Sequence, residues 1–182
     1  MEVRVALRKV AVMGHPILRE IAKPIPVKEI RTEKMQALIR DMAETMVEYE
    51  GRGLAAPQVH ESLQLVVMIW DFDEGKKSAL RVLINPVIIP LTKETSPYWE
   101  GCLSLPGMRG RVHRPNRIAV ETLNEKAEQQ KFEASGLAAT VIQHECDHLM
   151  GKLYVDRMTD FTQFAFTREY QRFVVEEEDA GE

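Results

Sequence analysis

Hydrophobic positions repeat with the period of a helix in some segments and with the alternation of a strand in others. The helical period is clearest near the N-terminal end. Between Thr32 and Glu48, apolar residues recur at spacings of three and four, which predicts an amphipathic helix with one buried stripe. The stripe consists of Met35, Leu38, Ile39, Met42 and Met46. Thr32 precedes the first turn and is suited to cap it, because its hydroxyl can accept a hydrogen bond from a free backbone N–H.

Four short segments have the composition or the alternation of strands. Residues 63–70 and 79–89 are rich in large and β-branched apolar side chains, and Pro86 within the second predicts an edge strand or a bulge. Residues 117–124 and 129–135 alternate on either side of a short polar segment, which predicts a hairpin.

Two more helices are expected toward the C-terminal end. One opens at Ser135 or Gly136 and runs to Met150, and the other covers residues 161–175. Candidates for the buried side of the last helix are Phe161, Phe164, Ala165 and Phe173. Strands in the middle and helices toward the ends predict an α+β fold, with mixed or antiparallel strands packed around the helix that ends at Met150.

Composition and charge fit an ordinary globular protein. The 182 residues, 45% hydrophobic and 29% charged, suit one domain that spans residues 1–182. A net charge of −4 gives no general attraction to nucleic acid or anionic lipid, so we expect neither DNA nor a membrane as partner, and a monomer. Residues 174–182 are acidic and are expected to form a flexible tail. A transient ribosome contact stays open as a partner, but we do not expect it through this tail, which is poor in Lys and Arg and would repel ribosomal RNA.

We expect neither a targeting segment nor a membrane span in this sequence. The N-terminal stretch MEVRVALRKV mixes charged and apolar residues, and the longest apolar stretch, VLINPVIIPL, is interrupted by Asn85 and two prolines. The two cysteines form no CxxC pair, which favours a reduced, cytoplasmic setting.

The segment QHECDHLMGKLY (143–154) holds two histidines four residues apart with a glutamate after the first. Residues at this spacing share one face of a helix, so His144 and His148 can bind one metal ion. Glu145 then lies beside the first ligand, where it can accept a proton from a water molecule. Two histidines at this spacing also occur by chance on half-buried helices, so the pair alone does not define a metal site.

A metal site of this kind needs a third protein ligand, and the residues leave two candidates. Tyr154 stands where the longer HExxHxxGxxH pattern has its third histidine, which excludes that pattern. Glu169, further downstream, would make the protein a zinc endopeptidase, although its charged neighbours favour a solvated helix face. Cys102, in WEGCLSLPG, offers a thiolate, which is a strong ligand for a borderline metal.

Three motifs in fixed order resemble the peptide deformylase family. They are GRGLAAPQ (51–58), EGCLS (100–104) and QHECDHLMG (143–151), and the resemblance extends over roughly residues 10 to 158. The metal ligands that it implies are Cys102, His144 and His148. It implies Glu145 as the general acid and base, the Gln58 amide and the Leu103 backbone N–H as donors to the developing oxyanion, and Gly53 as a point of close approach for the substrate backbone.

The resemblance also implies the reaction, which is hydrolysis of the N-formyl group from the initiator methionine of nascent polypeptides with release of formate. It implies one divalent metal ion, Fe²⁺ in the cell, which Zn²⁺, Ni²⁺ or Co²⁺ can replace in purified protein. Leu137 and Val141 precede His144 by seven and three residues, so we expect them to wall a pocket for the methionine side chain or to pack in the core. A structural metal clip is the alternative from another class, and it would have four protein ligands.

Other residues in the motifs receive no ligand role. Cys146 lies between the ligand positions and is expected to pack rather than coordinate, and His60 stands where glycine is common in the first motif. Glu100 and Asp147 are nearby carboxylates that can brace a ligand histidine, but the sequence does not show which of them braces which group.

Overall fold

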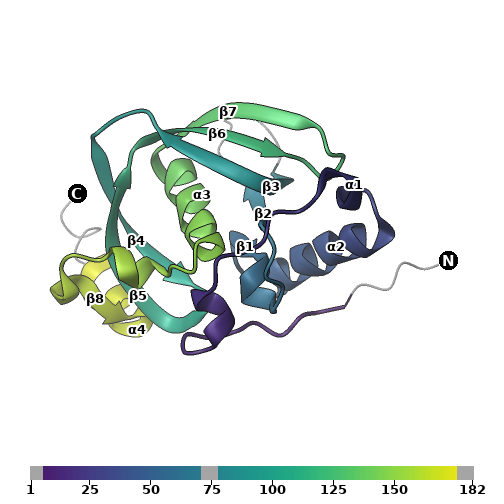
Figure 1. Ribbon diagram of the computed structural model, residues 1–182. Helices are drawn as coiled ribbons and strands as arrows, with labels where there is room; N and C mark the ends of the chain where they lie inside the picture. The colour runs from purple at the N-terminus through teal and green to yellow at the C-terminus, as the bar shows by residue number, and fades with distance from the viewer. Residues whose placement is uncertain (1–5, 71–77, 176–182) are drawn as a thin grey trace.

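In the computed structural model, which describes residues 6–70 and 78–175, two antiparallel sheets pack against one helix, α3 (Gly136–Leu149) (Figure 1). The larger sheet has the strand order β1 (Gly53–Ala55), β2 (Leu65–Trp70), β3 (Ala79–Pro90), β6 (Arg117–Leu123), β7 (Gln129–Ser135). The smaller sheet has the order β4 (Thr95–Cys102), β5 (Leu105–Pro115), β8 (Phe164–Phe166). The predicted α+β class, with strands around a central helix, is confirmed.

Helix α2 (Glu33–Glu48) forms as the apolar stripe predicts. All five residues of the stripe are buried, and they pack against strands β1 and β2 in one hydrophobic cluster with Leu54 and Val67. The Thr32 hydroxyl accepts a hydrogen bond from the Met35 N–H at 3.4 Å, which caps the helix. Helix α2 therefore covers the β1 end of the larger sheet.

The predicted strands of the larger sheet are also present. Strands β2 and β3 pair antiparallel, and the register of β3 against β6 shifts between Ile84 and Val87, on either side of Pro86. Strands β6 and β7 form the expected hairpin. Helix α3 starts directly after β7, so the hairpin carries the chain straight into the helix that bears both histidines.

Strands β4 and β5 are not among the predicted strands, and they matter most for the site. They form a hairpin in which Cys102 pairs with Leu105, and Leu103 and Ser104 make the turn between them. The EGCLS motif is therefore the end of β4 and the hairpin turn. Strand β4 contacts α3 (Figure 1), and Cys102 is its last residue.

The prediction of one helix over residues 161–175 is wrong. The segment divides into η4 (Phe161–Gln163), strand β8, α4 (Thr167–Tyr170) and η5 (Gln171–Val175). Residues 164–166 pair with the free edge of β5, and these backbone hydrogen bonds replace those of a helix. Phe161 and Phe173 are exposed, at 65% and 51%, whereas Phe164 packs beside Tyr154.

Short elements complete the described chain. They are η1 (Pro16–Arg19), α1 (Val27–Ile30), η2 (Ala56–Val59) and η3 (Tyr154–Arg157). The acidic tail lies mostly beyond residue 175 and so outside the described residues. Over residues 6–70 and 78–175, no helix is long and apolar enough to cross a membrane.

Candidate active site

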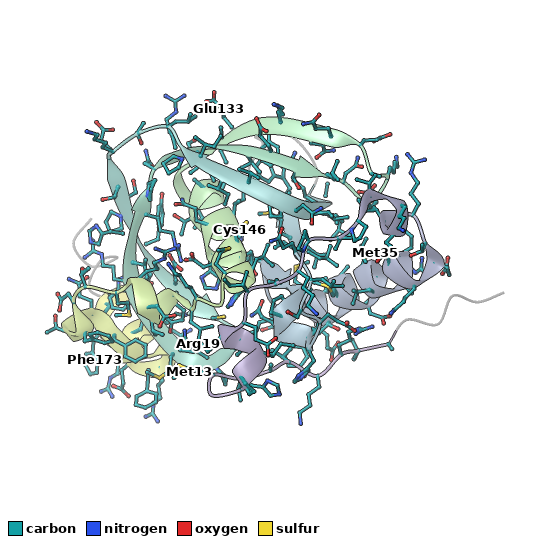
Figure 2. All side chains as sticks on the ribbon, viewed as in Figure 1. Met13, Arg19, Met35, Glu133, Cys146 and Phe173 are labelled. Atoms are coloured by element: carbon teal, nitrogen blue, oxygen red, sulfur yellow. The ribbon has the colours of Figure 1, made fainter. Side chains whose placement is uncertain are left out.

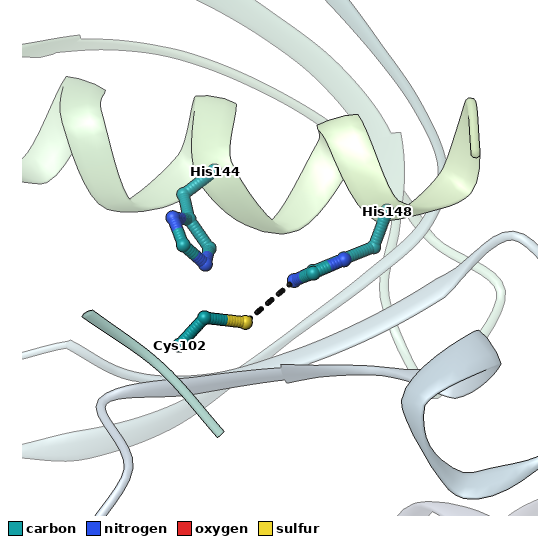
Figure 3. A group of neighbouring side chains, drawn as sticks. All are labelled: Cys102, His144 and His148. Atoms are coloured by element: carbon teal, nitrogen blue, oxygen red, sulfur yellow. Dashed lines mark hydrogen bonds between the residues drawn. The ribbon is translucent and has the colours of Figure 1, made fainter. Parts of the chain in front are cut away.

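Three side chains that could bind a metal converge between helix α3 and the tip of β4. His144 and His148 project from one face of α3, and Cys102 reaches toward them from the opposite side (Figure 3). The ligand atoms of the three residues all lie within 4.8 Å of one another, and the Cys102 Sγ lies 3.3 Å from the His148 Nε2. The i, i+4 spacing read from the sequence thus produces the expected shared face.

The carboxylate of Glu100 fixes the orientation of His144. Its Oε2 lies 2.7 Å from the His144 Nδ1, and both groups are buried. Burial by itself raises the pKa of Glu100, but the hydrogen bonds from His144 and Arg114 outweigh it and the pKa is lowered, so Glu100 accepts and the His144 Nδ1 carries the proton. The Nε2 lone pair of His144 is then free for a metal ion.

Arg114 holds Glu100 in turn. Its Nε and Nη2 donate to the two oxygens of Glu100 at 2.6 and 3.0 Å, and its Nη1 donates to the Asp147 Oδ2 at 2.7 Å. Arg157 also donates to Asp147. Both carboxylates that the sequence left unassigned therefore bind Arg114, but only Glu100 contacts the ligand histidine, whereas Asp147 holds Arg114 and Arg157.

Sequence reasoning missed Arg114, although a signal was present. On β5, Gly110, Val112 and Arg114 alternate with more exposed residues and are all buried, so Arg114 points to the same side as the core. Once β5 is recognised as a strand, a buried arginine in it requires carboxylate partners, and two lie in the neighbouring motifs.

Charge and donor type fit a divalent metal ion. Burial opposes ionisation of Cys102, but the imidazoles of His148 and His144 more than offset it and hold the pKa of the thiol well below its usual range. One thiolate and two imidazoles suit a borderline transition metal, and three protein ligands leave a position open for chemistry.

Cys146 differs from Cys102 in every respect that matters for ligation. It lies on α3 among apolar residues of the larger sheet and belongs to no group of potential ligands in the described chain (Figure 2). Burial and the neighbouring carboxylates of Glu145 and Asp147 raise the pKa of its thiol. The expectation that Cys146 packs is confirmed.

Glu145 lies beside the cluster with its carboxylate enclosed. It is 5% exposed, and its Oε2 has no hydrogen-bond partner among the described residues. Burial raises the pKa of Glu145, although the two histidines oppose this. The side chain rests against Gly53 on β1, where any Cβ would lie 2.5 Å from the Glu145 Oε1. Only glycine at position 53 leaves room for this carboxylate.

Gln58 and Leu103 lie on the sheet side of the cluster. The Gln58 Nε2 lies 3.4 Å from the Cys102 Sγ, which places its amide hydrogens beside the ligands. Leu103 follows Cys102 directly in the hairpin turn, so its backbone N–H is adjacent to the ligand in the chain. Both residues therefore lie next to Cys102.

The remaining residues singled out in the sequence are Leu137, Val141, Tyr154 and Glu169. Leu137, in the first turn of α3, is 42% exposed, and Val141 is half-buried against the larger sheet. Tyr154 stacks its ring on the His144 imidazole, with centroids 5.9 Å apart. Glu169 lies on α4 beside Arg168 at 3.9 Å and is not in the ligand group found over the described residues.

A half-buried cysteine and two histidines that could share one metal ion, next to a carboxylate oxygen with no hydrogen-bond partner among the described residues, are typical of a metal-dependent hydrolase. Comparison with known proteins gives the family. The family described as polypeptide deformylase matches residues 7–164, and the chain belongs to it.

Relatives and solved structures agree with this assignment. The chain is 43% identical to a peptide deformylase of Acinetobacter baumannii (strain SDF) over 173 residues, which is 95% of each chain. A crystal structure of the Thermotoga maritima peptide deformylase matches with a TM-score of 0.76 and 39% identity, covering 85% of this chain and 99% of that one.

A Met-Ala-Ser-bound class I type b enzyme of A. baumannii matches with a TM-score of 0.78 and 33% identity, covering 85% of this chain and 100% of that one. Peptide deformylases are hydrolases that remove the N-formyl group from nascent peptides. The predicted family, enzyme class and reaction are therefore confirmed.

Proposed function

We propose that Cys102, His144 and His148 hold one divalent metal ion and that deformylation takes place beside it. The observation that carries the proposal is the convergence of these three ligand atoms within 4.8 Å of one another. Fe²⁺ is the ion that family resemblance implies in the cell, and Zn²⁺, Ni²⁺ or Co²⁺ suit the same donors. When bound, the ion supplies Lewis acidity that polarises the formyl carbonyl and lowers the pKa of water.

Glu145 acts as the proton carrier in this proposal. Its carboxylate accepts a proton from the attacking water and later gives it to the departing amine. Two features support this role: the Oε2 has no partner among the described residues, and burial raises its pKa toward the range in which a carboxyl group both accepts and releases a proton. Gly53 leaves room for this carboxylate, because a Cβ at position 53 would collide with it.

Gln58 and Leu103 stabilise the negative charge that develops on the formyl oxygen. The Gln58 side-chain amide and the Leu103 backbone N–H both lie next to Cys102 and can donate toward the reacting group. Donors fixed before the reaction need no reorganisation, and one such donor is worth about 10²–10³ in kcat.

Gly53, Leu137 and Val141 contact the substrate in this account. Gly53 lets the peptide backbone approach β1, and the two apolar residues of α3 wall the pocket for the methionine side chain. The relative that binds Met-Ala-Ser supports a peptide that begins with methionine. Because a charge in an apolar pocket is costly, Val141→Asp should raise KM for a formyl-methionyl peptide, and an unchanged KM would remove Val141 from the pocket.

The partners are N-formylmethionyl nascent peptides, and the setting is the cytoplasm, with residues 1–182 acting as one monomeric catalytic domain. We do not assign a ribosome contact to the acidic tail, because its charge repels RNA phosphate. Equal ribosome co-sedimentation of the full chain and of a chain with basic substitutions in this tail would contradict that view.

A formate-release assay tests the function. The protein is purified without oxygen, loaded with Fe²⁺ and incubated with a formyl-methionyl peptide and with the acetyl-methionyl analogue. We expect formate from the first and no acetate from the second, because a compact site that accepts hydrogen beside the carbonyl excludes a methyl group. No formate from metal-replete protein would overturn the proposal.

A further inference from the structure

Three partners hold the side-chain amide of Gln58 in one orientation. Its Oε1 accepts a hydrogen bond from the Ala55 backbone N–H at 2.8 Å. Its Nε2 lies 3.2 Å from the Ser104 Oγ and 3.4 Å from the Cys102 Sγ. Gln58 is 1% exposed and Ser104 is fully buried, so water does not replace either partner.

The chemistry of these partners allows only one assignment of the amide. The Ala55 N–H can only donate, so a rotation that exchanged Oε1 and Nε2 would set two donors against each other. The Nε2 has two hydrogens, and the Ser104 hydroxyl and the Cys102 sulfur can each accept one. Ser104 thus takes the hydrogen that points away from the ligands and leaves the other aimed at them.

We propose that Ser104 is a positioning residue for deformylation, because its hydroxyl takes one Nε2 hydrogen of Gln58 and so keeps the second, which lies toward the Cys102 sulfur in the free protein, available to the reacting carbonyl oxygen. The inference rests on the proposed role of Gln58 as an oxyanion donor. Without the Ser104 oxygen, one buried N–H of the Gln58 amide loses its acceptor, and this favours rotation of the amide away from the ligands. Ser104 touches neither the substrate nor the ligand atoms in this account.

The backbone supports the same arrangement. Near the N-terminal end, the Ala11 N–H donates to the Gln58 carbonyl and the Met13 N–H donates to the Ser104 carbonyl, both at 2.7 Å. Residues 11–13 therefore tie the first motif to the turn of the β4–β5 hairpin. Because the two backbones are fixed to each other, the side-chain contact between Gln58 and Ser104 can keep its geometry through the reaction.

A double-mutant cycle tests the proposal. Ser104→Ala should lower kcat by about tenfold, less than the loss caused by Gln58→Ala, with little change in KM. The double variant Ser104→Ala/Gln58→Ala should be no slower than Gln58→Ala, because Ser104 acts only through Gln58. Each protein is measured with one metal loaded and its metal content determined, which we expect to be equal in all of them.

Two further measurements separate positioning from stability. In the zinc-loaded protein, the paired NMR signals of the Gln58 Nε2 hydrogens should change in shift and exchange faster in Ser104→Ala. Thr45→Ala is the matched control, because Thr45 is also a fully buried hydroxyl that accepts from a backbone N–H, that of Arg8 at 2.9 Å. It should lower the free energy of unfolding but leave both the Gln58 signals and kcat unchanged.

Each result decides a different point. Full activity and unchanged Gln58 signals in Ser104→Ala, with Gln58→Ala impaired, would overturn the positioning role alone. An equal loss from Ser104→Ala in the presence and absence of Gln58 would overturn it too, because Ser104 would then act elsewhere. Full activity of Gln58→Ala would overturn the proposed oxyanion role itself, and the inference with it.

Discussion

The Nδ1 of His144 lies 2.7 Å from the Oε2 of Glu100, and this contact determines which ring nitrogen faces Cys102. Arg114 donates hydrogen bonds to both oxygens of the same carboxylate. The ligand histidine is therefore oriented by Glu100 and Arg114, neither of which reaches the metal position. Outer partners of this kind usually decide how tightly a metal is held.

Replacing Glu100 should therefore weaken metal binding while leaving the ligands in place. We expect Glu100→Gln to lower the affinity for Zn²⁺ by about 10- to 100-fold, measured by competition with a chelator. Glu133→Gln is the control, because Glu133 lies on β7 in the larger sheet (Figure 2) and its ion pair among the described residues is with the exposed Arg117. Equal affinities in the two variants would show that the Glu100 contact does not support the ligand.

Glu145→Gln should separate metal binding from chemistry. Glutamine has nearly the same shape but cannot carry the proton, so we expect kcat to fall by about 10²–10⁴ with unchanged metal content. The measurement is formate release by variant and parent at equal metal loading. A variant that kept the parent kcat would assign proton transfer to another group.

Gly53→Ala should impair the same carboxylate indirectly. The added Cβ would lie 2.5 Å from the Glu145 Oε1, so the side chain must move, and we expect kcat to fall with the metal retained. Gly51→Ala is a milder change in the same motif, since its Cβ would meet the end of the flexible Leu103 side chain at 3.0 Å. Formate release should fall more in Gly53→Ala than in Gly51→Ala, and the reverse order would contradict the packing argument.

The ion pair between Arg19 and Asp156 should give a pH-dependent contribution to stability. Burial by itself raises the pKa of Asp156, but Arg19 and the Leu153 N–H lower it below its usual value of 3.8. A carboxyl group whose pKa is lower in the folded state stabilises the fold above its unfolded pKa, and this contribution is lost as pH falls through the folded pKa.

Denaturant unfolding of the parent and of Asp156→Asn tests this sign. Because both side chains are partly exposed, we expect a difference in unfolding free energy of about 1 kcal/mol or less at neutral pH. The difference should shrink as the pH falls below about 4. A difference that grew toward acid would mean that the carboxylate is not stabilised in the folded state.

The sequence predicted the elements whose patterns are local and uninterrupted. Helix α2 follows from five apolar positions at helical spacing, and the shared face of His144 and His148 follows from four residues of helix. Both depend only on neighbouring residues, so no knowledge of the rest of the fold was needed.

The parts that were missed depend on distant partners. In β4 and β5, glycine and proline interrupt the alternation, and the strands are stabilised by each other across the hairpin. Residues 164–166 read as helical because their phenylalanines fit either period, and only the free edge of β5 decides for a strand. Arg114 was overlooked for the same reason, since its burial follows from the strand in which it lies.

The central claim is that Cys102 is the third ligand, and metal content measured after anaerobic purification tests it most directly. The comparison needs the parent, Cys102→Ala, Cys146→Ala and Glu169→Ala. We expect one equivalent of metal in the parent and in the last two variants, and almost none in Cys102→Ala, because Cys102 is the one residue that joins the two histidines in the ligand group found over residues 6–70 and 78–175. Retention of metal by Cys102→Ala, or its loss from Glu169→Ala, would contradict the account.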